Sequence, residues 1–149
     1  MDTKKNIHIL LADDDDDDRM FFRQAIAELN LGTNLTTVQN GQELMSYLHD
    51  PSAQLPDIIF LDLNMPVMGG LQSLSQIRNS KGLQDIAVVI YSTSTSEQDI
   101  EDCLTCGANI YLRKPTDFDE LKALLYKAIT VNHHYTISSQ SRENFVMVI

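Results

Sequence analysis

Residues 56–70 read P-D-I-I-F-L-D-L-N-M-P-V-M-G-G, and this stretch decides how the rest of the chain is interpreted. Its apolar run, residues 58–61, is short and is bounded by prolines at positions 56 and 66. Such a run is typical of a strand that is buried on both faces. Asp62 therefore lies where a buried strand reaches the surface. In an open parallel sheet, ligands bind beyond the carboxyl ends of the strands, although an isolated aspartate there more often only begins a turn.

Four further segments predict strands. Apolar runs lie at residues 7–11, 86–91 and 110–113, and residues 35–38, L-T-T-V, are a weaker candidate. Apolar residues spaced by three and four predict helices between the strands and after the last one. The expected helices cover residues 22–29, 40–48, 71–81, 94–106 and 118–129.

Capping motifs mark the start of two of these helices. Asn40 is followed three residues later by Glu43, and Ser94 is followed three residues later by Glu97. In such a capping box, each side chain accepts a hydrogen bond from a backbone N–H group that the helix leaves unpaired. We therefore expect helices to begin at Asn40 and at Ser94, the second of them running toward Cys106.

The alternation of strands and helices predicts the fold. Five strands that alternate with five helices imply parallel strands joined by right-handed crossovers. We expect an α/β fold with one doubly wound, five-stranded parallel sheet in the flavodoxin-like order 2-1-3-4-5. The domain should cover residues 1–131, and residues 132–149 should form a C-terminal tail with no separate effector domain. The apolar end at 145–149 fits an extra strand or an association segment, and equally a segment that packs back on its own domain.

The composition favours a single globular domain. The chain has 149 residues, of which 43% are hydrophobic, so it can bury a core without disulfides. No apolar segment approaches the roughly 20 residues of a membrane-spanning helix, and the first residues lack the apolar centre of a signal peptide. Two cysteines are too few for a disulfide framework. We therefore expect a cytoplasmic protein that does not bind a membrane.

The charge balance bears on the partners. The chain carries 11 basic and 21 acidic residues, which gives a formal net charge of -10. A surface that binds nucleic acid needs clustered lysine and arginine. We therefore expect proteins or a cation as partners, and no nucleic acid.

Three carboxylates should meet at one edge of the predicted sheet. With strands one and three as neighbours, their carboxyl ends bring Asp13, Asp14 and Asp62 together. At an effective dielectric constant of about 20 and a separation of roughly 5 Å, each ionised pair repels by about 3 kcal/mol. Such a group needs a cation or a proton. Mg²⁺ is the expected cation because it prefers oxygen ligands and is held by one or two carboxylates together with phosphate.

Two more polar residues end strands at the same edge. Ser92 supplies a hydroxyl group after strand four, and Lys114 supplies an ammonium group after strand five. The ammonium gives a phosphoryl oxygen a charge-assisted hydrogen bond, and the hydroxyl gives a neutral one. Asp62 would then be the nucleophile that accepts the phosphoryl group.

The residues at these positions resemble the receiver domains of two-component response regulators. The resemblance covers residues 7–129 and rests on four motifs in family order. They are the acidic pair at 13–14 after I-L-L-A, L-D-L-N-M-P around Asp62, Ser92 after A-V-V-I-Y, and Y-L-R-K-P at 111–115. Each motif alone is weak, but the four together are specific. The chain is similar to the stand-alone receivers that accompany phytochrome-type histidine kinases.

The resemblance implies a phosphorylation-controlled signalling switch. Asp62 would accept a phosphoryl group from a phosphohistidine on a sensor histidine kinase or a histidine phosphotransfer protein. Mg²⁺ would be held by Asp14 and Asp62, by Asp13 largely through water, and by the backbone carbonyl group of Asn64. Lys114 would contact the phosphoryl group. The protein would catalyse only its own phosphorylation and dephosphorylation, without turnover of an external substrate.

The resemblance also implies how the signal leaves the site. The hydroxyl group of Ser92 would move toward the phosphoryl group, and Tyr111 would rotate inward behind it. A downstream protein would bind helix four, strand five and helix five, and a homodimer is an open alternative. The family usually has threonine at position 92. Serine lacks the β-methyl group that stiffens χ1, so we expect looser coupling to Tyr111.

Several features also have a plain structural interpretation. Residues 15–18 extend the acidic pair and fit a solvated loop and helix N-terminus, which the helix dipole favours. Cys103 and Cys106 match C-x-x-C, but they lie near a helix end and not at the N-terminus that would activate a thiol, so core packing is favoured. The two histidines at 133–134 have no further metal ligand at a suitable spacing in the sequence, so they fit a solvated tail.

Two other functions remain open at this point. A haloacid-dehalogenase-type phosphohydrolase also uses a strand-end aspartate with Mg²⁺, but it normally needs a second aspartate two residues on. Asn64 occupies that position here and cannot act as the general acid. The other alternative is a receiver-like binding module that is never phosphorylated.

Overall fold

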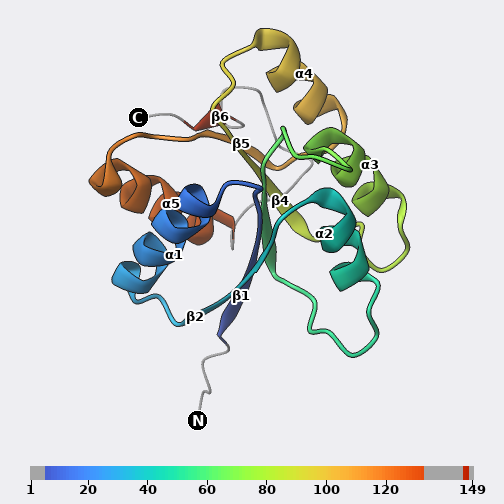
Figure 1. Ribbon diagram of the computed structural model, residues 1–149, viewed down its shortest axis with the longest axis horizontal. Helices are drawn as coiled ribbons and strands as arrows, with labels where there is room; N and C mark the ends of the chain where they lie inside the picture. Colours follow the sequence, from blue (N-terminus) through green and yellow to red (C-terminus); the bar gives the residue numbers. More distant parts are fainter. Residues whose placement is uncertain (1–5, 133–145, 148–149) are drawn as a thin grey trace.

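The protein folds around one parallel sheet with helices on both faces (Figure 1). The computed structural model describes residues 6–132 and 146–147. Within these residues the strand order is β2-β1-β3-β4-β5-β6, and every neighbouring pair is parallel. The strands are β1 (Ile7–Ala12), β2 (Thr33–Val38), β3 (Ile58–Leu61), β4 (Ala87–Ser92), β5 (Ile110–Arg113) and β6 (Val146–Met147). The helices are α1 (Asp16–Leu29), α2 (Gly41–Leu48), α3 (Gly70–Asn79), α4 (Glu97–Thr105) and α5 (Phe118–Asn132).

The predicted order 2-1-3-4-5 is confirmed, but the strand count of five is one short. The short strand β6 pairs with β5, with Val146 opposite Tyr111 and Met147 opposite Leu112. The apolar C-terminal segment therefore contributes the extra strand that was one of its predicted alternatives. Helix α5 continues through Asn132, and the histidine pair at 133–134 lies outside the described residues.

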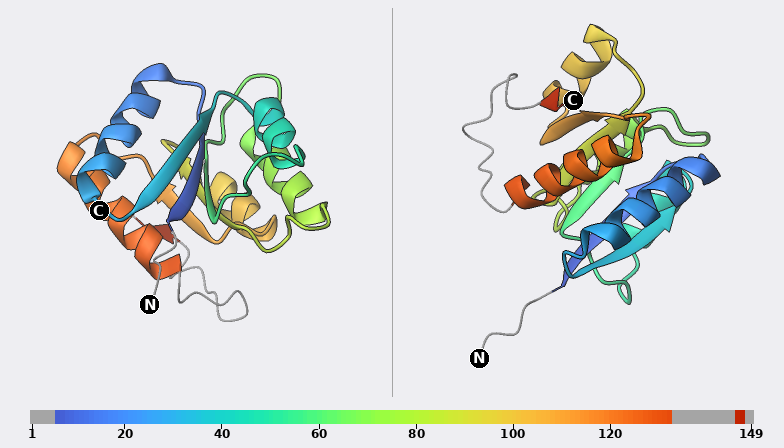
Figure 2. Two further views of the ribbon diagram at one scale, coloured as in Figure 1. Left: turned by 90° about the horizontal axis from the view of Figure 1, so that it is seen from below. Right: turned by 90° about the vertical axis from the view of Figure 1, so that its left-hand side faces the viewer.

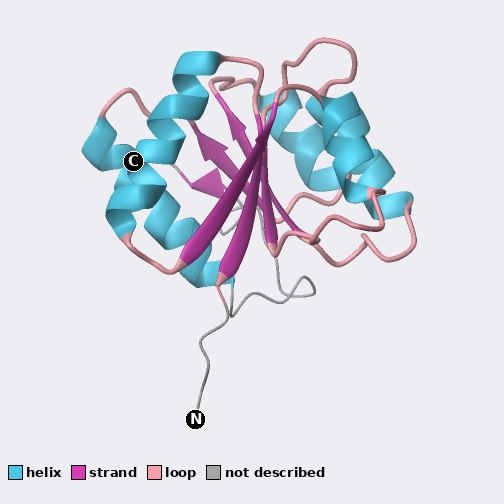
Figure 3. Cartoon of the chain, turned by 60° about the horizontal axis from the view of Figure 1, so that its bottom comes forward, coloured by secondary structure: helices cyan, strands magenta, loops and turns pink. Residues whose placement is uncertain are grey.

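Helices cover the two faces of the twisted sheet (Figures 2 and 3). Helices α1 and α5 lie side by side on one face, and α2, α3 and α4 lie on the other. Strand β1 shows how the sequence builds both cores at once, because alternate side chains of a strand point to opposite faces. Ile9 and Leu11 pack with α1 and α5, whereas Leu10 and Ala12 pack toward α2 and α3. Buried strands therefore read as continuous apolar runs.

The two predicted helix starts have different outcomes. The side chain of Asn40 caps α2 by accepting a hydrogen bond from the backbone N–H group of Glu43 at 2.8 Å, as predicted. Helix α4, however, is capped by Ser96, which accepts from the backbone N–H group of Asp99. The predicted capping box at Ser94 is therefore wrong by two residues. Ser94 instead donates from its hydroxyl group to the Asp99 carboxylate at 2.6 Å.

None of the described helices is long and apolar enough to cross a membrane.

Candidate functional site

The carboxyl ends of β1 and β3 bring two aspartates together. Ala12 and Leu61 are partners in the register of these strands, so Asp13 and Asp62 follow them side by side. Both are buried, with 0% and 6% of their surface exposed, whereas Asp14 faces solvent. Carboxylate oxygens of the three residues lie within 4.8 Å of one another. The predicted cluster is therefore formed.

Lys114 brings a positive charge into this cluster from the end of β5. Its backbone N–H group donates to the carbonyl oxygen of Ser92, which fixes the end of β5 against β4. Its Nζ atom lies 2.9 Å from Asp13 Oδ2, 2.8 Å from Asp18 Oδ2 and 3.6 Å from Asp62 Oδ2. Only 9% of the lysine side chain is exposed. One buried ammonium group is thus shared by three carboxylates.

Burial and charge perturb the acid–base properties of the site. Burial raises the pKa of Asp62 to about 7, with Lys114 lowering it and Asp13 adding to the increase. Burial also raises the pKa of Asp13 above its ordinary value. Burial alone would lower the pKa of Lys114, but hydrogen bonds to Asp18 and Asp13 outweigh it, so this pKa lies above its ordinary value. Lys114 therefore stays charged at neutral pH, and the carboxylates hold more negative charge than it can balance.

The cluster fits a divalent cation. Asp13 Oδ1 accepts a hydrogen bond from the backbone N–H group of Asp15 at 3.0 Å. Asp13 Oδ2 is buried and contacts the ammonium group of Lys114 at 2.9 Å. Together with Asp14 and Asp62 it offers the hard oxygen ligands that Mg²⁺ or a similar ion prefers.

Ser92 and Tyr111 connect the cluster to α4. Ser92 is fully buried at the end of β4, and its hydroxyl oxygen accepts a hydrogen bond from the backbone N–H group of Ser94 at 3.1 Å. The hydroxyl group of Tyr111 donates to the carbonyl oxygen of the same Ser94 at 2.9 Å. Tyr111 is 1% exposed, so its ring is directed inward in this structure. The loop between β4 and α4 therefore contacts both side chains.

The loop after Asp62 is held close to the site. The backbone N–H group of Asn64 hydrogen-bonds to the Asp62 carboxylate, while the side chain of Asn64 faces solvent. Gly70 donates its backbone N–H group to Leu63, and a Cβ atom at position 70 would lie only 2.3 Å from the carbonyl oxygen of Asp62. Only glycine allows α3 to begin so close to the end of β3.

Two residues that contact the site, one within the acidic run and one directly after it, were not predicted from the sequence. Asp18 was interpreted as part of a solvated run, but its carboxylate accepts a hydrogen bond from Lys114. Arg19 is buried, donates to the carbonyl oxygen of Asp13 at 2.6 Å and pairs with Asp16. Helical spacing could have identified Asp18, because it lies four residues before Phe22 and thus on the buried side of α1.

The two cysteines belong to the fold, as predicted. Cys103 is buried in the core beneath α4, and Cys106 is half-buried at the end of that helix. Both are free thiols. Burial raises the pKa of Cys103 to about 12, which leaves it protonated and unreactive at neutral pH.

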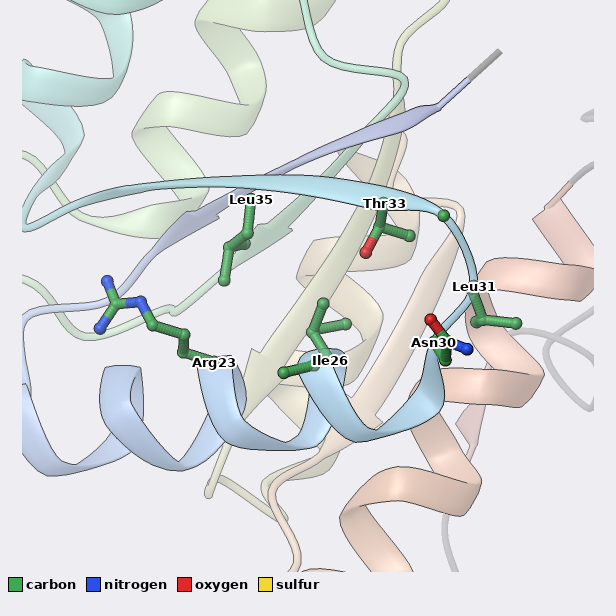
Figure 4. Close-up of a pocket in the computed structure, with 8 residues that line it drawn as sticks. Arg23, Ile26, Asn30, Leu31, Thr33 and Leu35 are labelled. Atoms are coloured by element: carbon green, nitrogen blue, oxygen red, sulfur yellow. The ribbon is translucent and has the colours of Figure 1, made fainter. Parts of the chain in front are cut away.

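A separate pocket lies between α1 and β2 (Figure 4). It has a volume of about 280 Å³, and Ile26 and Leu35 form part of its apolar wall. Thr33, at the amino end of β2, also lines it, so the pocket lies away from the edge that carries Asp13 and Asp62. Arg23 is the one charged residue that lines it, and the pocket has no carboxylate that could accept a phosphoryl group or bind a cation.

Comparison with known proteins agrees with this geometry. The response regulator receiver domain matches residues 9–126. The chain belongs to this family. Among relatives of the receiver domain, the probable methanogenesis regulatory protein FilR2 of Methanothrix harundinacea is 34% identical over 117 residues, which cover 76% of each chain. The transcriptional regulator NtrC of Salmonella typhimurium is 31% identical over 137 residues, which are 90% of this chain but only 26% of NtrC.

Solved structures of phytochrome response regulators are also similar to this receiver domain. The phosphorylated cyanobacterial phytochrome response regulator RcpA has a TM-score of 0.81 and 29% identity, covering 89% of this chain and 98% of RcpA. The bacteriophytochrome response regulator AtBRR has a TM-score of 0.73 and 27% identity, covering 89% of this chain and 96% of AtBRR. Both matches span nearly the whole of the chain in the solved structure.

Proposed function

We propose that this receiver domain accepts a phosphoryl group on Asp62 from a phosphohistidine donor and signals through protein contacts. Phosphorylation-dependent signalling is the function of its family. The observation that carries the residue assignment is the position of Lys114, whose ammonium group lies 3.6 Å from the carboxylate of Asp62 at the mouth of the sheet. A nucleophilic carboxylate beside a fixed ammonium group suits the transfer of an anionic group.

Each residue of the cluster would have a distinct role in the transfer. A carboxylate oxygen of Asp62 would form the O–P bond while the P–N bond to the donor imidazole breaks, and that nitrogen would then take up a proton. Lys114 would hold an equatorial phosphoryl oxygen by a charge-assisted hydrogen bond, and the Ser92 hydroxyl group would donate to another. Asp13 would orient Lys114, because its Oδ2 atom lies 2.9 Å from Nζ.

Mg²⁺ is the proposed cofactor. Asp14 and Asp62 would bind it directly, Asp13 largely through water, and Asn64 through its backbone carbonyl group. When bound, the ion offsets negative charge that builds up on the phosphoryl oxygens. The crowding of three carboxylates around a single ammonium group supports this assignment.

The proposed output path begins at Ser94. A shift of the Ser92 hydroxyl group toward a phosphoryl group would break its hydrogen bond with the Ser94 backbone, which Tyr111 also contacts. The start of α4 would then move. A downstream protein would bind the surface of α4, β5 and α5, or a second copy would bind there, and the donor would be a sensor histidine kinase or a phosphotransfer protein. We propose that this activity belongs to a receiver domain of residues 1–131, in the cytoplasm and away from membranes and nucleic acid.

The test is phosphorylation of the purified protein with acetyl phosphate and Mg²⁺. We expect a hydroxylamine-labile adduct on Asp62, identified by mass spectrometry, that disappears in Asp62→Asn and persists in Asp85→Asn. Asp85 is an exposed aspartate before β4, at the opposite edge of the sheet, so its variant controls for charge. A wild-type protein that forms no adduct would refute the proposal.

The two alternative functions receive no such support. Asn64 stands where the phosphohydrolase needs an acid, and turnover of a phosphomonoester would be required to favour that enzyme. For the unphosphorylated binding module, the deciding observation is whether beryllofluoride with Mg²⁺ changes partner affinity or oligomeric state.

A further inference from the structure

Lys114 has a hydrogen-bond partner that the transfer reaction does not require. Its Nζ atom donates to Asp18 Oδ2 at 2.8 Å, whereas Asp62 Oδ2, the proposed phosphoryl acceptor, lies 3.6 Å away. The ammonium group is thus drawn to the α1 side of the site. Asp18 is 96 residues away in sequence and belongs to a different element, so this contact depends on the tertiary fold.

The position of Asp18 is fixed by the start of α1. Asp15 caps the helix and accepts a hydrogen bond from the backbone N–H group of Asp18 at 2.9 Å. One turn later, the ring of Phe22 packs edge-on against Phe60 and Tyr91, with ring centroids 5.0 and 5.5 Å away. The helix is therefore anchored to the sheet immediately after Asp18. The carboxylate of Asp18 therefore has a fixed position in the site, unlike the charge of a flexible surface side chain.

Asp18 and Lys114 line the same open pocket at the solvent side of the site. Phe21 and Pro115 also line this pocket, which has a volume of about 340 Å³. The side chain of Asp18 is 39% exposed and that of Lys114 is 9% exposed, so Asp18 is on the solvent side of their contact. An anion that reaches the Lys114 ammonium group from this pocket therefore meets the Asp18 carboxylate beside it.

We propose that Asp18 is a positioning residue that competes with the phosphoryl group for Lys114 and so weakens the hold of the site on that group. The inference rests on the proposed function. An ammonium group has three N–H donors, and in this structure Asp18 at 2.8 Å and Asp13 at 2.9 Å already contact it. A phosphoryl group on Asp62 needs a donor from the same nitrogen. Its oxygens are also repelled by the fixed charge of Asp18, so two effects act in the same direction.

Asp17 provides a matched control. It is the preceding residue in the same helical turn and carries the same charge, but it is exposed and has no ion pair with Lys114 among the described residues. Asp17 also lines the pocket that Asp18 and Lys114 share, so Asp17→Asn reports the general change in charge there. Any larger effect of Asp18→Asn reports the direct contact with the lysine.

The experiment measures the affinity for beryllofluoride, a phosphoryl mimic, by calorimetry at fixed Mg²⁺. We expect Asp18→Asn to bind it about fivefold more tightly than wild type, the order expected when a partly exposed charged hydrogen bond is released. Asp17→Asn should stay within about twofold, as exposed charges are screened by salt. Asp18→Glu, which keeps the charge, should stay close to wild type. Thermal unfolding of each variant checks that the fold is intact.

A double-mutant cycle with Lys114→Ala tests whether Asp18 acts through the lysine. In the Lys114→Ala background, Asp18→Asn should change the affinity no more than Asp17→Asn does. Equal effects of the two asparagine variants in the wild-type background, or weaker binding by Asp18→Asn, would overturn the inference. If wild type itself neither binds beryllofluoride nor forms the adduct on Asp62, the proposed function is wrong. If wild type does both and the Asp18 variants fail to differ, only the inference is wrong.

Discussion

Replacing Asp62 with asparagine should stabilise the metal-free protein, although it removes the proposed phosphoryl acceptor. The pKa of Asp62 is raised from 3.8 to about 7 because the carboxylate is buried beside Asp13. The folded state therefore binds the proton of Asp62 more tightly than the unfolded state does. That difference corresponds to about 4 kcal/mol, which is an upper limit because Asp13 and Lys114 share the charge.

The sign of the effect fixes its pH dependence. Below pH 3.8 Asp62 carries a proton in both states, so ionisation contributes nothing to the difference between wild type and Asp62→Asn. As the pH rises toward 7, the unfolded state is ionised first and wild type loses stability; above pH 7 the loss is complete. The advantage of Asp62→Asn should therefore grow between pH 4 and 7 and then level off, reaching roughly 2 kcal/mol once the loss of the Lys114 contact is included.

Urea unfolding in EDTA at pH 5 and pH 8 measures this difference. Asp85→Asn is the control, because Asp85 is exposed and lies at the other edge of the sheet. Added Mg²⁺ should stabilise wild type and have less effect on Asp62→Asn, since a ligand stabilises the state that binds it. An Asp62→Asn protein that is less stable than wild type at pH 8, or an advantage equal at both pH values, would refute the assignment of the buried charge.

Two further substitutions test how the loops around the site are held. Arg19→Gln removes a buried guanidinium group that donates to the Asp13 carbonyl oxygen. We expect the free energy of unfolding, measured in urea, to fall by about 1–3 kcal/mol and Mg²⁺ binding to weaken. Arg23 is exposed, so the control Arg23→Gln should change both quantities little. Gly70→Ala places a Cβ atom 2.3 Å from a backbone carbonyl oxygen, so it should destabilise the fold by roughly 2 kcal/mol or more and lower the thermal midpoint by several degrees. The control is Gly69→Ala, whose Cβ atom would lie 3.2 Å from its nearest neighbour and should lower the midpoint far less. Equal effects of the two substitutions would contradict the close approach of α3 to β3.

The fold was predictable because a parallel strand that is buried on both faces forms a continuous apolar run in the sequence. Strands β1, β3, β4 and β5 are largely apolar runs of four to six residues, and the helices between the strands show regular spacing. The edge strand β2, T-N-L-T-T-V, is mostly polar and was the weakest strand prediction. Helix starts are harder to predict where two cap residues compete. Ser94 and Ser96 both precede an acid three residues on, and the choice depends on the tertiary contact of Ser94 with Asp99 and Tyr111. Strand β6 is only two residues long, too short for any pattern.

The proposed site was predictable in so far as it depends on strand ends. Parallel strands terminate at a common edge, so Asp13, Asp62 and Lys114 had to meet once the strand order was right. Asp18 does not end a strand. The acidic composition of the run predicts a solvated side chain at Asp18. Its direction instead follows from its position in the helix, four residues before the buried Phe22.

The excess negative charge at the site destabilises the fold, and it is also what would make the site respond to a cation or a phosphoryl group. One buried ammonium group serves several carboxylates, and the fold tolerates the excess charge because large apolar clusters on both faces of the sheet hold β1, β3 and β5 in place. In the proposed switch, a cation or a phosphoryl group would change which carboxylate Lys114 contacts. Ser92 and Tyr111 both hydrogen-bond to the backbone of Ser94, so a redistribution of charge at Asp62 would reach the start of α4 through these two hydrogen bonds.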